Sequence, residues 1–326
     1  MRHKSVSYAK YGYLFCIPFV LVYLLFSLYP TIYTIIIGFT DLKGLGKTDF
    51  SILPDPLTNF KLILNNASFQ TSLKNTLVIW IINFIPQIFV ALLLTAWFTN
   101  HRNKVKGQGA FKVLFYMPNI ITAATIAILF NSLFGYPKGP VNDLLIMMGI
   151  LDNPTNFLLQ GNTAKGVVAF IQFWMWYGYT MIVLISGVLG INPELFEVAE
   201  IDGASSTKTF FYITLPNLRT IIIFTLITSL IGGLQMFDIP RLFLFGGPDN
   251  ATLTTSLFIF NQAFSGSYMY NRAAAASMLL FIIIAILSSF VFYIMRDKYD
   301  AKIRKQEKLY KKQQNKAKRA ARKVTA

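Results

Sequence analysis

The side chains that carry out most enzymatic chemistry are scarce in this 326-residue chain. It has two histidines, His3 and His101, and one cysteine, Cys16. The patterns HExxH, CxxC and GxSxG do not occur, so a zinc site, a redox-active thiol pair and a nucleophile elbow each lack their residues. The sequence therefore predicts no catalytic residue, no metal site and no cofactor bound by this chain.

One short stretch, GLGKTDF, contains the run Gly46-Lys47-Thr48 that also occurs in phosphate-binding loops. Such a loop needs a further glycine five positions before the Gly-Lys pair, so that backbone N–H groups can surround the phosphates. Asp41 occupies that position. Nucleotide binding by this stretch is therefore not expected.

Asp238 is the one acidic residue within the long apolar runs of the chain, and Arg241 follows it three positions later. An ionisable group inside a membrane marks a functional candidate. Residues at i and i+3 of one helix are also neighbours that can form an ion pair. We expect Asp238 and Arg241 to pair with each other near the outer end of their run.

Long apolar runs must position these few side chains. Hydrophobic residues make up 54% of the chain and charged residues 13%, a balance typical of membrane proteins. Six runs are long enough, at about 1.5 Å per residue, to cross a hydrocarbon core of about 30 Å. They are residues 13–39, 76–98, 113–134, 166–190, 220–243 and 273–295. Because backbone groups in lipid must bond internally, we predict an all-α membrane protein of six transmembrane helices, kinked at Pro30, Pro86, Pro118 and Pro240.

The distribution of Lys and Arg predicts the orientation of these helices. With the N-terminus inside, 22 of the 30 basic residues fall on the inner side and 8 on the outer side. Segments rich in Lys and Arg stay in the cytoplasm. Both termini are therefore predicted to be cytoplasmic.

The chain reads as one transmembrane domain with two cytoplasmic ends. Residues 1–12 form a short N-terminus, 13–295 the six-span domain and 296–326 a tail with 13 Lys/Arg and 3 Asp/Glu. The basic tail can attract anionic lipid headgroups. No folded nucleic-acid-binding module accompanies its charge, so nucleic acid is not an expected partner.

The loop 191–219 between the fourth and fifth runs has an internal pattern of its own. Asn192-Pro193 is typical of a helix start and Gly203 of a helix end, which predicts a helix over residues 193–202. One arc of this helix holds Leu195, Phe196, Val198 and Ala199, and the other holds Glu194, Glu197 and Glu200, with Ile201 among them. A second short helix begins at Ser205 or Ser206. An amphipathic hairpin of this kind predicts a docking element. An interfacial helix lying on lipid is the alternative, which the acidic residues disfavour.

The same loop resembles a known signature. Glu197, Ala199 and Gly203, followed after nine residues by Ile213-x-Leu215-Pro216, resemble the EAA motif of membrane permease subunits of binding-protein-dependent ABC importers, with Val198 in place of the second motif residue. IDGAS, FFYITLP, FYMPNIITAATIAILFNSLFG and GPVNDLL extend the likeness to the carbohydrate-uptake branch, close to its maltose-type first permease. The resemblance covers roughly residues 12–296 and implies a type I importer fold in a bacterial inner membrane.

The resemblance also implies how the loop works. In that family the EAA loop is a coupling helix that rests in a cleft of a cytoplasmic ATPase subunit, which binds ATP and Mg. The residues expected to make this contact are Glu197, Val198, Ala199, Ile201, Asp202, Gly203, Ala204 and Ser205.

A sugar substrate implied by the resemblance needs hydrogen-bonding and aromatic side chains near the bilayer midplane. Gln172, Trp176 and Tyr179 follow each other at i, i+4 and i+7, on one helical face. With them, the substrate-binding residues that we predict are Thr125, Ser229, Gly233 and Gln235. Two alternatives stay open, because aromatic residues also form interfacial belts and small residues also serve helix packing.

The family implies several partners. They are a second permease subunit, expected to be a different polypeptide in a heterodimer, two cytoplasmic ATPase subunits, an extracytoplasmic solute-binding protein and the membrane lipid. An ion-gradient-driven secondary transporter is the alternative function, although it would need intramembrane carboxylates and only Asp238 is available. Oligosaccharide and glycerol-phosphate-like substrates both remain open.

Overall fold

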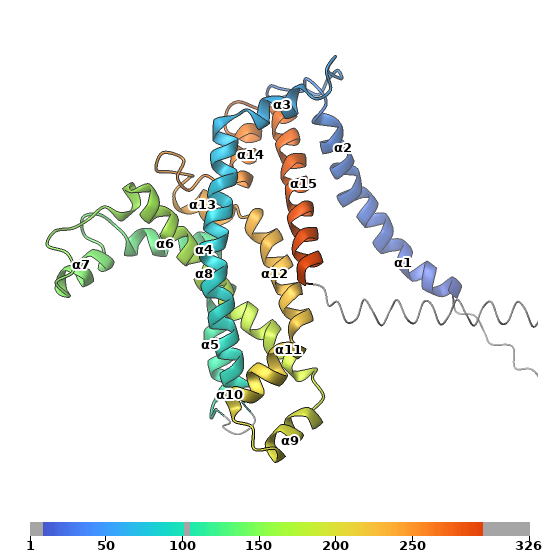
Figure 1. Ribbon diagram of the computed structural model, residues 1–326. Coiled ribbons are helices and arrows are strands. Elements are labelled where there is room, and N and C mark those ends of the chain that lie inside the picture. The colour runs from blue at the N-terminus through green and yellow to red at the C-terminus, as the bar shows by residue number, and fades with distance from the viewer. Residues whose placement is uncertain (1–8, 101–104, 296–326) are drawn as a thin grey trace, which may run out of the picture.

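The computed structural model describes residues 9–100 and 105–295, and the described residues form helices joined by loops without a β-strand (Figure 1). The first half contains α1 (Ala9–Tyr23), η1 (Leu24–Leu28), α2 (Tyr29–Ile37), α3 (Thr58–Leu64), α4 (Ala67–Phe98), α5 (Gln108–Ile120), α6 (Ala123–Leu133), α7 (Pro140–Met147) and η2 (Phe157–Leu159). The second half contains α8 (Gly161–Leu189), α9 (Glu194–Ile201), α10 (Ser206–Thr209), η3 (Phe210–Thr214), α11 (Leu215–Asn217), α12 (Arg219–Leu234), α13 (Asp238–Phe243), α14 (Thr255–Phe264) and α15 (Tyr270–Met295).

Within residues 9–100 and 105–295, five helical segments are long and apolar enough to cross a membrane without interruption by a sharp bend. They are Lys10–Ile37, Ala67–Phe98, Gly161–Leu189, Arg219–Phe243 and Tyr270–Met295. Each contains or nearly contains one of the six predicted runs, so the all-α membrane fold is confirmed. The predicted tail 296–326 and most of the predicted N-terminus 1–12 lie outside the described residues.

Residues 113–134 were predicted to form one continuous span with a kink at Pro118, but the structure divides them between two helices. Helix α5 ends at Ile120 and α6 begins at Ala123, and the two are bent by 90°. Ile121 and Thr122 are extended, with ψ near 136° and 146°, and the Thr122 hydroxyl accepts a hydrogen bond from the backbone N–H of Thr125. Thr122 therefore starts a new helix as its N-cap, and α6 leaves the direction of α5.

At two other prolines, Pro30 and Pro216, the helix continues because the turn before the proline is π-helical. The π-helical turn η1 comes just before Pro30, and η3 comes just before Pro216. A proline in a helix lacks the N–H that would bond four residues back, and its ring clashes with that carbonyl. Widening the preceding turn to a π-helix relieves both effects. Helix α4 continues through Pro86 without such a turn.

Helix α8 occupies the centre of the bundle. In its most apolar window 44% of the residues are buried inside the chain, against 6% for the first span. Met181, Leu184 and Ile185 of α8 form one apolar cluster with Ala91 and Leu94 of α4. The first span instead leans away from the other spans (Figure 1).

Close backbone approach fixes α8 against α5. A Cβ placed on Gly178 would lie 2.0 Å from the carbonyl oxygen of Phe115, so only glycine fits there. On the side of α4, the Gln87 amide donates a 2.8 Å hydrogen bond to the Thr180 hydroxyl, and both side chains are buried. A satisfied polar pair of this kind joins two spans where water is excluded.

Substituting Gly178 tests this packing. Gly178→Ala forces α5 and α8 apart, and such overpacking costs about 1–3 kcal/mol. Gly166→Ala is the matched control, because it lies in the same helix with no atom within 4 Å of the added Cβ. We expect a lower thermal unfolding midpoint for purified Gly178→Ala and an unchanged or slightly higher one for Gly166→Ala. Equal midpoints would contradict the close approach.

Candidate functional site

A cavity of about 360 Å³ lies between α4, α8, α12 and the start of α13. Six of the seven residues predicted to bind substrate line it: Gln172, Trp176, Tyr179, Ser229, Gly233 and Gln235. The volume falls within the range of about 300–1,000 Å³ that is usual for small-molecule sites. The structure thus brings together side chains that are up to 63 positions apart in the sequence.

The α8 wall of this cavity carries its exposed aromatic rings. Trp176 and Tyr179 are 42% and 41% exposed, and their rings meet edge to face with centroids 5.7 Å apart. Gln172 lies one turn before Trp176 on the same face of α8. Ring faces and an amide beside one cavity suit a ligand that has both apolar and hydroxyl-bearing faces.

Trp80 forms the opposite wall and was missed by the sequence analysis. A Cβ on Gly233 would lie 2.0 Å from Cδ1 of Trp80, so the indole lies directly against the backbone of α12. The Trp80 Nε1–H donates a 3.3 Å hydrogen bond to the Ser229 hydroxyl. Gly233 therefore makes room for Trp80, whereas a Cβ on neighbouring Gly232 would meet no atom within 4 Å.

Buried polar groups of α4 also reach this cavity and were not predicted. Asn83 and Gln87 are 5% and 4% exposed and line it together with Thr180. The Asn83 amide donates to the carbonyl of Ile79, and Gln87 donates to Thr180. The signal was available, because Asn83 and Gln87 stand four positions apart within an apolar run.

Thr125 is not brought to the cavity. It is exposed near the start of α6, and its hydroxyl lies 2.9 Å from that of Thr122. Ala123, two positions earlier at the start of α6, lines the cavity, whereas Thr125 does not.

The predicted pairing of Asp238 with Arg241 is wrong. The Arg241 guanidinium lies over two aromatic rings, 5.2 Å from the centroid of Phe245 and 5.1 Å from that of Phe260. Asp238 is the first residue of α13 and lines the cavity. Cation–π attraction to these rings, and not an ion pair with the Asp238 carboxylate, holds the Arg241 guanidinium. One of the two rings, Phe260, belongs to α14.

The loop 191–219 forms the predicted hairpin at the far end of the bundle from α3 (Figure 1). Helix α9 spans Glu194–Ile201, and the Asn192 side chain accepts a hydrogen bond from the N–H of Glu194. At its end Gly203 has φ +70°, Gly203 N–H donates to Glu200, and Ala204 N–H donates to Ala199. This pair of bonds is a Schellman motif, for which glycine is favoured. Ser205 then caps α10 by accepting from Lys208 N–H.

The buried face of α9 is narrower than the predicted apolar arc. Only Phe196 and Ala199 are buried, and Phe196 packs with Val188 and Leu218. Leu195 and Val198, predicted on the same arc, are 42% and 55% exposed. Ile201 is 85% exposed, so these three form an outward apolar stripe at i, i+3 and i+6. Glu194 and Glu197 are exposed beside this stripe.

Comparison with known proteins shows the family to which a chain with this cavity and this hairpin belongs. Residues 76–305 match the family model described as binding-protein-dependent transport system inner membrane component. The chain belongs to this family. The matched region contains both the cavity and the hairpin, and the resemblance drawn from the loop 191–219 is confirmed at this level. The protein is a multi-pass inner-membrane permease of a binding-protein-dependent importer, and the ion-gradient alternative is set aside.

Two relatives match the permease along most of its length. The lactose transport system permease protein LacF of Rhizobium radiobacter is 32% identical over 289 residues, covering 88% of this chain and 94% of LacF. The arabinooligosaccharides transport system permease protein AraP of Bacillus subtilis is 33% identical over 287 residues, covering 87% and 88%.

A solved structure confirms the fold of the permease. It is a chain of a bacterial ABC transporter involved in the import of the acidic polysaccharide alginate, with a TM-score of 0.72 and 22% sequence identity. The likeness covers 87% of this chain and 94% of that one.

Adjacent glycines on α12 test the Trp80 wall of the cavity. Gly233→Ala places a methyl group where the Trp80 indole lies and should displace the ring, whereas Gly232→Ala points into open space. We expect a shifted ¹⁹F resonance for 5-fluorotryptophan at position 80 in Gly233→Ala and an unshifted one in Gly232→Ala. Trp80→Phe assigns the signal. Identical spectra for the two alanine variants would refute the contact.

Proposed function

We propose that the permease moves a saccharide through the cavity between α4, α8 and α12. The observation that carries this proposal is the α8 wall, where Gln172, Trp176 and Tyr179 lie side by side on the cavity. Sugars present apolar faces that stack on aromatic rings and hydroxyl groups that hydrogen-bond with amides. In this proposal Ser229, Gly233 and Gln235 belong to the α12 side of the same path, and Thr125 does not touch the substrate.

The printed names of the relatives support this substrate class. LacF is named for lactose and AraP for arabinooligosaccharides, and a multiple sugar-binding transport system permease of Streptococcus mutans is 29% identical. We infer an oligosaccharide, delivered by an extracytoplasmic binding protein that makes much of the selection. The test is the ATPase activity of the reconstituted transporter with its binding protein across a panel of mono- and oligosaccharides. Stimulation by none of them would reject the proposal.

The hairpin is proposed to couple the permease to a cytoplasmic ATPase. The outward stripe Leu195, Val198 and Ile201 beside Glu194 and Glu197 suits a groove with an apolar floor and a basic rim. The contact is proposed to involve the eight residues Glu197, Val198, Ala199, Ile201, Asp202, Gly203, Ala204 and Ser205. Ala199 and the αL glycine Gly203 shape the hairpin from within. ATP and Mg are bound by the ATPase, and this chain hydrolyses nothing.

The complete transporter is proposed to contain this permease, a different second permease, two ATPase subunits and the binding protein. Both termini and the hairpin then lie in the cytoplasm, as the Lys/Arg distribution predicts. Native mass spectrometry tests the composition. Two copies of this chain in one complex would replace the heterodimer with a homodimer.

Trp176→Ala removes the ring that we propose stacks on the substrate. We expect substrate uptake by the complete transporter to need about tenfold more ligand, because one aromatic contact of about 1.4 kcal/mol is lost. The control is Thr125→Ala, which lies outside the cavity. Basal ATPase activity should be equal in both variants. Equal losses of uptake in Trp176→Ala and Thr125→Ala would argue against the α8 wall.

Val198→Asp and Ile201→Asp place a carboxylate on the outward stripe of α9. We expect each to weaken retention of the ATPase subunit by at least about tenfold, because an unpaired charge would be buried in an apolar groove. Met147→Asp is the matched control, since Met147 is 87% exposed in α7, away from the hairpin. Subunit ratios after affinity purification measure the effect. Wild-type ratios in both α9 variants would exclude this stripe as the docking surface.

A further inference from the structure

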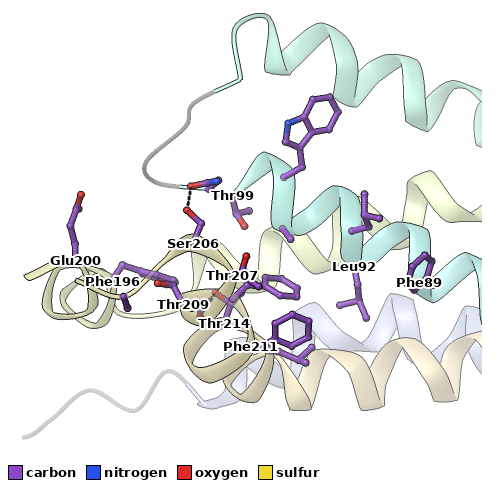
Figure 2. Close-up of a pocket in the computed structure, with 17 residues that line it drawn as sticks. Phe89, Leu92, Thr99, Phe196, Glu200, Ser206, Thr207, Thr209, Phe211 and Thr214 are labelled. Carbon is purple, nitrogen blue, oxygen red and sulfur yellow. Dashed lines mark hydrogen bonds between the residues drawn. The ribbon is translucent and has the colours of Figure 1, made fainter. Parts of the chain in front are cut away.

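A second cavity lies where α4 meets the hairpin. It encloses about 480 Å³ and is bounded by the last third of α4 on one side and by α10, η3 and part of α9 on the other. Figure 2 shows Phe89 and Leu92 at one end of this groove and Thr99 and Ser206 at the other. The substrate cavity shares none of its lining residues.

The groove changes from apolar to polar along its length. Its apolar part is lined by Phe89, Leu92, Leu93, Ala96, Trp97 and Phe211. Its other part carries hydroxyl and amide groups, among them Thr99, Thr207 and Ser206, whose hydroxyl donates a 3.2 Å hydrogen bond to Asn100. The polar part coincides with the end of the α4 span at Phe98. A ligand that fits must therefore be amphipathic, with its polar group at the membrane surface.

The length of the groove matches one leaflet of a bilayer. Thr99 comes ten positions after Phe89, which at about 1.5 Å per residue is about 15 Å, half of a hydrocarbon core of about 30 Å. Its wall also continues an exposed apolar stripe on α4, formed by Ile81, Ile85, Phe89, Leu93 and Trp97 at steps of four residues. A chain in the surrounding hydrocarbon can therefore enter the groove from the side.

One basic residue, Lys208, lies next to the polar end of the groove. Exposed Lys208 stands between the lining residues Thr207 and Thr209. Lys112 has its Nζ 5.8 Å from the ring centroid of Phe98, but Phe98 packs with residues of α5 and α8 and does not line the groove. Glu200 is the one acidic residue among the lining residues. Among the described residues, Lys208 is the basic residue adjacent in the chain to two lining residues, and its ammonium group can attract the phosphate of an anionic lipid at this surface.

We propose that this groove binds an anionic phospholipid of the inner leaflet, with one acyl chain along Phe89–Trp97 and the phosphate near Lys208. The leaflet follows from the predicted orientation of the hairpin. Because Phe196 and Glu200 of α9 border the groove, the bound lipid packs the hairpin against α4. The proposal is independent of the transported substrate.

The test uses the complete transporter in phosphatidylcholine vesicles that contain phosphatidylglycerol with a diazirine near the end of one acyl chain. After irradiation, mass spectrometry maps the lipid adducts. We expect them to concentrate on residues 89–97 and 210–215. Ala96→Trp, which fills the groove, should lower this yield about tenfold, the effect of withdrawing about two methylene groups from burial. Ile85→Trp, on the same stripe outside the groove, should leave it unchanged.

A second variant separates headgroup recognition from folding. Lys208→Glu should lower the yield with the phosphatidylglycerol probe and leave that of a phosphatidylcholine probe unchanged. Adducts spread evenly over exposed residues of α15 such as Phe281 and Phe290 would overturn the proposal, because they indicate bulk lipid. Labelling of Ile81 and Ile85 without labelling of 89–97 would also overturn it, because another subunit would then fill the groove.

Discussion

The contact of α8 with α4 and α5 is the interaction on which the geometry of the cavity and the hairpin depends. Gly178 lets the backbone of α5 touch α8, and the buried bond from Gln87 to Thr180 joins α4 to the same level of the helix. Within lipid there is no water to replace such bonds, so their loss would expose unpaired polar groups. With α8 held from two sides, its third face is free to carry Trp176 and Tyr179 on the cavity.

The same helix connects the cavity to the hairpin. Helix α8 ends at Leu189, and α9 begins at Glu194, with only residues 190–193 between them. Val188 of α8 packs against Phe196 of α9 and against Leu218, which directly precedes α12. The hairpin therefore packs against α8 and against the start of α12, the two helices that also line the cavity. A displacement of α9 by a partner subunit would therefore be transmitted to the cavity through packed side chains, as in shear motions of helices.

Much of this arrangement could be predicted, because lipid imposes strong rules on sequence. Run length located the spans, and capping residues such as Asn192 and Gly203 located the hairpin. The break at Ile121-Thr122 was missed because a β-branched pair within an apolar run looks the same in a continuous span as in an extended turn. Arg241 was paired with Asp238 by local spacing, whereas contacts between distant segments decided its position at Phe260. Trp80 was missed because only the packed structure shows what Gly233 accommodates.

The π-helical turn η3 has a consequence for the direction in which the outward stripe of α9 faces. A π-turn holds one residue more than an α-turn, and each residue of an α-helix advances about 100° around the axis. Phe210–Thr214 thereby sets the azimuth of α9 and α10 relative to α12. Deleting one residue there would keep the hairpin intact but swing its outward stripe about a quarter turn. Pro216 lies fifteen positions after Ile201, and through the π-turn before it this proline helps to set the direction in which the outward stripe faces.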